Sequence, residues 1–266
     1  MNASNPPAAR LLEDRRERVL LVTISNPALR NALGPDVYRA AKPLFEKAGS
    51  DDGIGAIVLA GEGEHFCGGG NLNRLKAQRS LPADAQQQSL DAFHAWILAM
   101  QDCPKPVIAA VEGAAAGGGF SLALACDLIV AAEDARFVMS YAKIGLSPDG
   151  GGSDSLARSL APQTALEILL AAQPVSAARL HALGIVNRVV ARGTALAAAL
   201  QWAERLAAGP SLAHAAAKRL VYEARGRSRT AQLDAERDAF LQSLYSDECA
   251  EGIAAFLDKR APRFHS

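Results

Sequence analysis

Two glycine runs, residues 68–70 and 117–119, are the first feature of this sequence whose residue types and spacing could support chemistry. Glycines 117–119 stand directly before the apolar run 120–126, which is typical of a buried helix. Glycines at a helix start leave its first N–H groups uncovered at the positive end of the helix dipole, where they can hold an anion or a developing oxyanion. Close packing of the helix on the preceding strand explains the same residues, so both interpretations stay open. The triplet is not the dinucleotide-binding fingerprint, because it lacks the G-x-G-x-x-G spacing, and no P-loop occurs in the sequence.

A second candidate is a single carboxylate, Asp149, in the run Ser147-Pro148-Asp149-Gly150. Pro followed by Asp and Gly is typical of a tight turn, which is the purely structural explanation. A carboxylate on such a turn can also remove and return a proton if the fold places it beside a substrate.

The hydrophobic pattern predicts the scaffold that must position these residues. Two β-prone runs, 11–13 and 19–24, enclose a charged turn over 14–17 and predict a hairpin, and residues 35–49 have helical spacing. Further apolar runs predict buried strands over residues 54–60, 107–111 and 127–131. The helix over 120–126 joins the last two strands into a βαβ unit, so we expect an α/β fold.

From Ser155 onward, the chain is mainly Ala-, Leu- and Arg-rich helix, interrupted near 184–190. No composition break marks a linker. We therefore predict a disordered tail over 1–10, a core over 11–205, and a C-terminal helical oligomerisation lobe of the same domain over 206–266.

Composition limits the partners of the chain. Among its 266 residues, Lys plus Arg and Asp plus Glu number 28 each, so no charge excess favours nucleic acid or a membrane surface. The 4 cysteines show neither C-x-x-C spacing nor a histidine at zinc-finger spacing, which predicts reduced, mostly buried thiols and no metal site. With no apolar leader at the start, we expect a cytoplasmic protein.

Several motifs, taken in order, resemble the enoyl-CoA hydratase/isomerase (crotonase) family. They are His65-Phe66-Cys67-Gly68-Gly69-Gly70-Asn71-Leu72, the run 110–120 with its glycine triplet, Ala125-Cys126-Asp127, and the run 145–151 around Asp149. Asn26-Pro27 near the start and Ala255-Phe256-Leu257-Asp258-Lys259-Arg260 near the end extend the match over nearly the whole chain. The resemblance implies the crotonase (ClpP-like) fold of repeated ββα turns and a homotrimer or dimer of trimers. It also implies an acyl-CoA thioester substrate, with no cofactor beyond the coenzyme A that the substrate carries.

The resemblance also implies the site residues. The amides of Gly70 and Gly118 would face the thioester oxygen, where two positioned N–H donors stabilise an enolate. The CoA arm would lie along Ala28, Leu29, Arg30, Gly68, Asn71 and Leu72. Phe256 and Lys259, from a neighbouring subunit, would contact its adenine end.

The sequence departs from a hydratase at two positions of the substrate site. Hydratases of this family hold a water between two glutamates, and here those places carry Ser121 and Tyr141. Neither a serine hydroxyl nor an unperturbed tyrosine, which titrates at about 10, is a base at neutral pH. In members that move a double bond, an acidic residue at the place of Asp149 shuttles the proton. Dehalogenases of the family also carry an aspartate there, but Leu98 stands where they have a histidine.

We therefore expect an enzyme that forms an enolate of an acyl-CoA, with Asp149 as the catalytic base. A double-bond isomerase of the Δ3-to-Δ2 or the ring-epoxide type is the favoured interpretation. An enoyl-CoA hydratase is the alternative, and a non-catalytic acyl-CoA-binding subunit is the second alternative.

Overall fold

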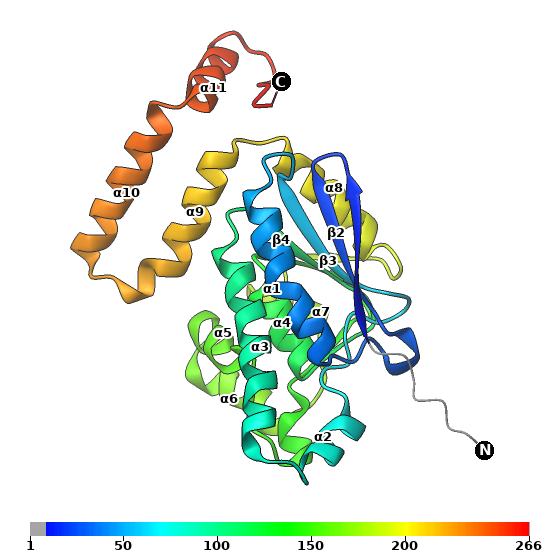
Figure 1. The fold of residues 1–266 in the computed structure, drawn as a ribbon. Coiled ribbons are helices and arrows are strands. Elements are labelled where there is room, and N and C mark those ends of the chain that lie inside the picture. Colours follow the sequence, from blue (N-terminus) through cyan, green and yellow to red (C-terminus); the bar gives the residue numbers. More distant parts are fainter. Residues whose placement is uncertain (1–8, 266) are drawn as a thin grey trace.

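A six-stranded sheet is the frame of the computed structural model, which describes residues 9–265 (Figure 1). Its strand order is β1-β2-β3-β4-β6-β9. β1 and β2 form the predicted antiparallel hairpin, and all other neighbours in this sheet pair in parallel. The strands are β1 (Arg10–Arg16), β2 (Val19–Ser25), β3 (Ala56–Gly61), β4 (Val107–Val111), β6 (Leu128–Ala132) and β9 (Arg188–Val190).

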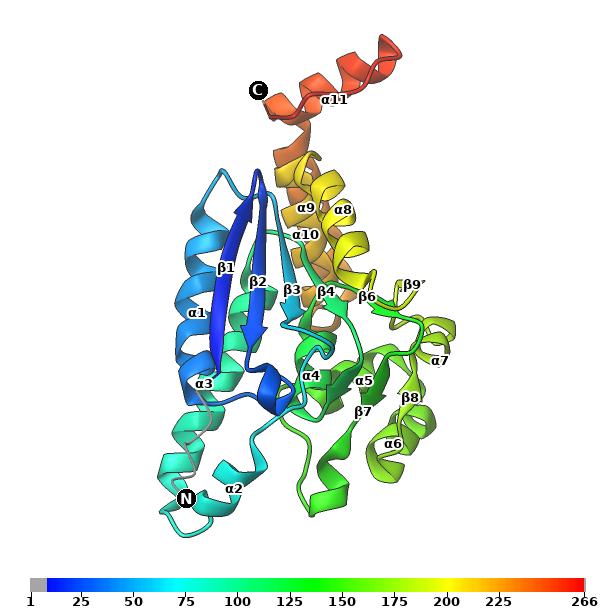
Figure 2. The ribbon, with the colours of Figure 1, turned by 90° about the vertical axis from the view of Figure 1, so that its right-hand side faces the viewer.

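Helices cover both faces of this sheet, which explains why its central strands are apolar at nearly every position. Successive side chains of a strand point to opposite faces. Leu20 and Val22 of β2 therefore pack in the main core with α1 (Pro35–Ser50) and α3 (Ala83–Asp102). Val19 and Leu21 pack instead against α8 (Ala195–Ala207). Figure 2 shows these helices on either side of the strands.

A smaller sheet, of order β5-β7-β8, sets the position of the candidate site. Its strands are β5 (Ala114–Ala116), β7 (Arg136–Val138) and β8 (Val175–Ser176). β5 and β7 are parallel, with Ala116 opposite Val138, so the two strands end at the same edge of the sheet. β5 leads directly into α4 (Gly118–Ala125), and β7 leads into the short helix η2 (Ser140–Ile144). The remaining elements of the core are η1 (Pro27–Leu29), α2 (Leu72–Gln78), α5 (Gly152–Ser159), α6 (Pro162–Ala171) and α7 (Ala177–Ala182).

The first hairpin differs from the prediction in the position of its turn. The expected turn over 14–17 is wrong: β1 continues through the charged residues to Arg16, and Arg16 pairs with Val19. The reversal falls on Glu17, with φ of 53°, and Arg18. Because β1 is an edge strand with mostly exposed side chains, it accommodates charges that read as a turn in sequence. Arg10 already belongs to β1, and residues 1–8 of the predicted tail lie outside the described residues.

The short strands β5, β8 and β9 have no counterpart in the predicted elements. Each has two or three residues, and its partner is a segment brought alongside by the fold. Such pieces carry no periodic pattern of their own.

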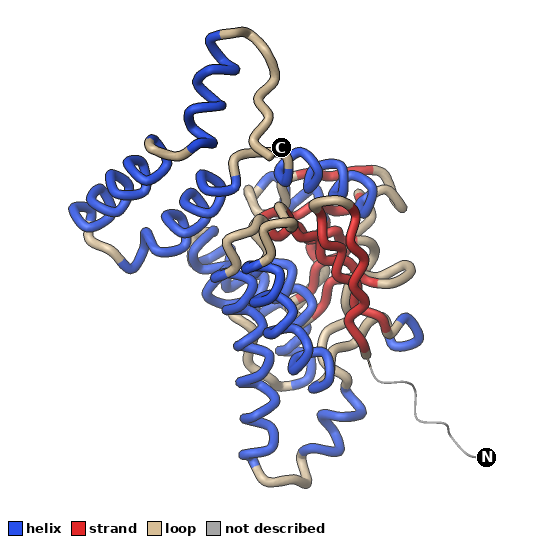
Figure 3. The backbone as a smooth tube through the Cα atoms, turned by 45° about the horizontal axis from the view of Figure 1, so that its top comes forward, coloured by secondary structure: helices blue, strands red, loops and turns tan. Residues whose placement is uncertain are grey.

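Three helices form a C-terminal lobe that extends away from the sheets (Figures 1 and 3). They are α9 (Ser211–Glu223), α10 (Arg229–Leu244) and α11 (Asp247–Leu257), with the short helix η3 (Ala224–Gly226) after α9. Within residues 9–265, no helix combines the length and the apolar character needed to cross a membrane.

A buried ion pair fastens α9 to the core. Lys218 Nζ lies 2.8 Å from Asp127 Oδ2, and it also donates to the main-chain oxygens of Met100 at 2.8 Å and Lys105 at 3.1 Å. Tyr222 donates to Asp127 Oδ1 at 2.9 Å. Burial raises the pKa of the Asp127 carboxyl, although the Lys218 ammonium acts in the opposite direction. The buried charges of Asp127 and Lys218 are therefore stabilised by each other and by the hydrogen bonds around them.

We expect Lys218→Met to destabilise the protein by about 3–5 kcal/mol, because it leaves the buried Asp127 carboxylate without its cation. Lys42→Met is the matched control, since Lys42 forms an exposed pair with Glu46 and such pairs contribute about 0–1 kcal/mol. The midpoints of urea denaturation measure both effects. Equal midpoints for the two variants would contradict the assigned role of Lys218.

Candidate active site

The two glycine loops predicted from sequence lie against each other. Cys67 forms a β-bridge with Ala115, and Ala116 N donates to Cys67 O at 2.9 Å. An added Cβ on Gly69 would lie 2.5 Å from Ala116 O and 3.3 Å from the Gly118 nitrogen. Gly69 also has a φ of 87°, which favours glycine. The loop after β3 therefore passes within contact distance of the start of α4.

Gly118 is the first residue of α4, and its amide has no acceptor within the helix. The preceding Gly117 has φ of 51° and ψ of −123°, a conformation that turns the chain into the helix. Ser121 N already donates to Gly117 O at 3.0 Å. The Gly118 N–H is thus available at the positive end of the helix dipole.

Gly70 presents its amide in a similar way. The isolated bridge between Leu33 and Gly70 uses the groups on either side of this glycine: Leu33 N donates to Gly69 O at 2.7 Å, and Asn71 N donates to Leu33 O at 3.4 Å. No backbone acceptor within residues 9–265 takes the Gly70 N–H. Two uncommitted amides on adjoining loops can together stabilise negative charge on one oxygen.

Asp149, Tyr141 and Ser121 form one hydrogen-bonded cluster beside Gly118. Tyr141 Oη donates to Asp149 Oδ1 at 2.5 Å, and Ser121 Oγ donates to the main-chain oxygen of Asp149 at 2.8 Å. Ser121 Oγ and Tyr141 Oη are 3.2 Å apart. Ser121 lies three residues after Gly118 in α4, so one helix turn joins this cluster to the free amide. Ser121 and Tyr141 are buried and Asp149 is half-buried.

The environment of Tyr141 keeps its hydroxyl protonated. Burial raises the pKa of Tyr141, and the neighbouring Asp149 charge raises it further. Tyr141 is therefore a hydrogen-bond donor and has no capacity to act as a base near neutral pH.

The Phe93 ring, which the sequence did not mark as part of the site, lies between the glycine loop and the Asp149 turn. An added Cβ on Gly118 would meet the Phe93 ring at 3.7 Å, and one on Gly150 would overlap it at 2.4 Å. Tyr38 stacks on Phe93 with ring centroids 5.0 Å apart. Burial raises the pKa of Tyr38, and the Asp149 charge adds to this effect. In sequence, Phe93 is an ordinary apolar position of an amphipathic helix, which signals only burial.

The residues predicted for the CoA arm lie partly along the same loop. Ala28 and Leu29 belong to η1, and the main-chain oxygen of Arg30 accepts from Gly68 N at 2.7 Å. This contact places the whole turn 28–30 beside the Gly68 segment.

The two residues after the glycine loop begin α2. Asn71 Oδ1 accepts from Arg74 N at 3.2 Å and so caps this helix. Leu72 is exposed.

Phe256 and Lys259 are not brought to this site within one chain. Both are exposed and lie at the end of α11, on the C-terminal lobe, which extends away from α4 and α2 (Figures 1 and 2). Any contact of these residues with a substrate would therefore involve another chain.

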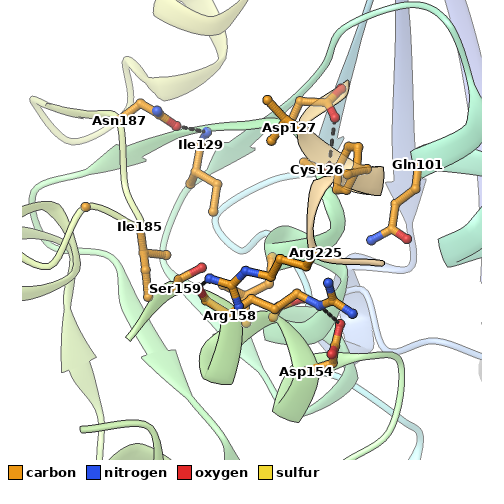
Figure 4. A pocket seen from close by; sticks show the side chains of 15 residues that line it. Gln101, Cys126, Asp127, Ile129, Asp154, Arg158, Ser159, Ile185, Asn187 and Arg225 are labelled. Atoms are coloured by element: carbon orange, nitrogen blue, oxygen red, sulfur yellow. Dashed lines mark hydrogen bonds and ion pairs between the residues drawn. The ribbon is translucent and has the colours of Figure 1, made fainter. Parts of the chain in front are cut away.

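A separate cavity of about 440 Å³ lies between α4, α5 and the end of α9, and none of the predicted site residues lines it (Figure 4). Its lining is polar, with Asp127 at one end and an ion pair of 2.5 Å between Arg158 and Asp154 at another. It marks the junction of the C-terminal lobe with the core. Within the described residues, no group of three or more His, Cys, Asp or Glu side chains is placed to hold a metal ion.

The cysteines follow the sequence interpretation. Cys67, Cys103 and Cys126 are buried and free, and Cys249 is partly exposed and free. Burial raises the pKa of Cys67 to about 12, so its thiol in the glycine loop remains protonated.

Comparison with known proteins assigns the family. The model of the enoyl-CoA hydratase/isomerase family matches residues 14–266, and the chain belongs to this family. It is 33% identical over 255 residues to the 1,2-epoxyphenylacetyl-CoA isomerase of Escherichia coli K12, covering 96% of this chain and 97% of that protein. It is 35% identical over 260 residues to the 2,3-dehydroadipyl-CoA hydratase of the same strain, covering 96% and 98%.

Solved structures agree with the fold. The crystal structure of an enoyl-CoA hydratase from Polaromonas sp. JS666 is 49% identical, with a TM-score of 0.94 over 96% of this chain and 99% of that chain. An enoyl-CoA hydratase from Mycobacterium smegmatis gives a TM-score of 0.89 at 33% identity, over 96% and 99%. The expected crotonase fold is confirmed.

The first test of the site concerns the Gly118 amide. Gly118→Pro removes the N–H at the first helical position, where proline is tolerated, and we expect turnover to fall by roughly 10²–10³-fold or more. Gly118→Ala is the matched control, because its Cβ would meet Phe93 at 3.7 Å and Leu33 at 3.8 Å, both ordinary contacts. Steady-state rates on an active acyl-CoA measure the difference. A folded proline variant as active as the alanine variant would show that this amide is not an oxyanion donor.

Proposed function

We propose that this protein is an acyl-CoA enzyme that moves a carbon–carbon double bond through an enolate, with Asp149 as the base and Gly70 and Gly118 as oxyanion donors. One observation carries the proposal. The half-buried Asp149 carboxylate accepts a hydrogen bond from Tyr141, and Ser121, which donates to the main-chain oxygen of Asp149, lies one helix turn from the free Gly118 amide. The site therefore offers one carboxylate. Positions 121 and 141, which could have supplied a second, carry a serine and a tyrosine.

The reaction follows from these groups. Asp149 removes a proton from the carbon next to the thioester, the C–H electron pair enters the conjugated system, and negative charge collects on the thioester oxygen between the two amides. The protonated carboxyl then returns a proton two carbons further along. The electron pair of the enolate reforms the carbonyl, and the double bond lies between the second and third carbons. Every proton and electron pair is accounted for by the substrate and one carboxylate.

Hydration is the second candidate function, because one of the relatives above is a hydratase and the cited crystal structures are of enoyl-CoA hydratases. This reaction also needs a water that is held and activated. Tyr141 and Ser121 stand at the positions expected to hold it, and both hydroxyls are already bonded to Asp149. The relative with an isomerase name supports the first candidate. A non-catalytic acyl-CoA-binding subunit is the third, and proton exchange distinguishes it from both enzymes.

Asp149→Asn tests the catalytic assignment. We expect isomerisation of a 3-enoyl-CoA to fall by roughly 10²-fold or more, the scale of positioned acid–base catalysis, while thioester binding is kept. Asp154→Asn is the control, since Asp154 is an exposed carboxylate on α5 paired with Arg158. Reactions of 3-enoyl- and 2-enoyl-CoA in D₂O, followed by mass spectrometry, report isomerisation, hydration and proton exchange together. Rapid hydration of crotonyl-CoA that is unchanged in Asp149→Asn would contradict the proposal.

We also propose that the chain assembles as a homotrimer or a dimer of trimers. The C-terminal lobe supports this, because it exposes large apolar side chains that would remain in water if the chain were a monomer. These are Leu233, Phe240, Tyr245, Ile253, Phe256 and Leu257.

Light scattering at micromolar concentration tests the assembly. We expect a mass three or six times that of the chain, whose mass is 27.8 kDa. A monomer would contradict the proposal, and a dimer would contradict its stoichiometry.

A further inference from the structure

The hydrogen bonds around Asp149 are limited by the number of available protons. Ser121 and Tyr141 each carry one hydroxyl proton, yet they take part in three contacts with each other and with Asp149. The main-chain oxygen of Asp149 can only accept. The proton of each hydroxyl can therefore be assigned from the distances.

Tyr141 must be the donor to the carboxylate. Its distance of 2.5 Å to Oδ1 is at the short end of the range for a hydroxyl bonded to an ionised acceptor, about 2.5–2.7 Å. Its proton is therefore committed to Oδ1. The Ser121 proton goes to the main-chain oxygen of Asp149 at 2.8 Å, so the longer 3.2 Å contact between Ser121 and Tyr141 has no proton of its own.

The result is two hydrogen bonds that hold one residue, from Tyr141 to the carboxylate of Asp149 and from Ser121 to its main-chain oxygen. Ser121 is fully buried and Tyr141 is 8% exposed, so water competes little for these bonds. Asp149 Oδ2, in contrast, accepts no hydrogen bond from residues 9–265.

We propose that Tyr141 is a positioning residue that occupies Oδ1 of Asp149 and so leaves Oδ2 as the one oxygen that exchanges protons with the substrate, while Ser121 holds the main chain of Asp149. The inference rests on the proposed role of Asp149 as the base. A carboxylate held at one oxygen and at its main chain cannot rotate freely. Both proton transfers of the isomerisation then occur from one fixed atom.

This arrangement also gives positions 121 and 141 a function in an isomerase. Their hydroxyls do not activate water. They convert a turn carboxylate, which would otherwise sample several rotamers, into a group of defined orientation.

The test compares Tyr141→Phe, Ser121→Ala and the double variant with wild type and Asp149→Asn, using a 3-enoyl-CoA. We expect Tyr141→Phe to lower kcat by about 10- to 100-fold with KM within about twofold, because orientation is lost while binding is kept. Ser121→Ala should lower kcat by about 2- to 5-fold, and the double variant should have a lower kcat than either single variant, since the two hydroxyls hold Asp149 at different oxygens. Asp154→Asn is again the control, because the Asp154 side chain is 62% exposed and pairs with Arg158.

The outcomes separate this inference from the proposed function. If Asp149→Asn is inactive while Tyr141→Phe keeps the kcat of wild type, the positioning role is overturned and Asp149 remains the base. If Asp149→Asn is as active as wild type, the proposed function itself fails. A rise in KM with unchanged kcat in Tyr141→Phe would assign the tyrosine to substrate binding and overturn the inference. If Tyr141→Phe does not fold, a kcat of Ser121→Ala equal to that of wild type overturns the inference that these two hydroxyls position Asp149.

Discussion

The site depends on one constraint: two chain segments approach each other more closely than side chains permit. A Cβ on Gly119 would lie 2.3 Å from Cys67 O, and one on Gly69 would lie 2.5 Å from Ala116 O. Glycine at both positions lets the loop after β3 bond to β5 as an extra bridge. This contact brings the amides of Gly70 and Gly118, from loops almost fifty residues apart, to one place. Without this contact, the Gly118 amide would have no second amide beside it.

A buried asparagine holds the first of these loops in register. Asn31 has φ of 57°, its Nδ2 donates to the main-chain oxygens of Glu62 at 2.9 Å and His65 at 2.6 Å, and its Oδ1 accepts from Asn26 N at 2.9 Å. One side chain thus satisfies backbone groups from two segments that no regular strand pairs. The turn 28–30 lies in the same assembly through the bond between Arg30 and Gly68. The candidate CoA surface and the candidate oxyanion donors are therefore parts of one rigid unit.

In the proposed function, the backbone fixes where charge is stabilised, and a few side chains decide which reaction follows. The amides of Gly70 and Gly118 would stabilise the negative charge of an enolate. At Ser121 and Tyr141 this chain has neutral hydroxyls bonded to Asp149. A carboxylate with such neighbours suits movement of one proton between two carbons, whereas a held water needs groups that those positions lack. Function is thus set at a few positions of a shared scaffold.

The sequence alone determined what local patterns encode. Apolar runs indicated the buried strands, and the glycines before an apolar run indicated the helix start near Gly118. The ordered motifs gave the family, and with it the expected positions of Asp149 and the amides. Only the tertiary structure decided which side chains meet: the Tyr141 bond to Asp149, the Phe93 ring against Gly150, and the pair of Lys218 with Asp127. The physical reason is that a periodic pattern reports which face of an element is buried, whereas such contacts depend on how distant elements pack and on the rotamers this packing allows.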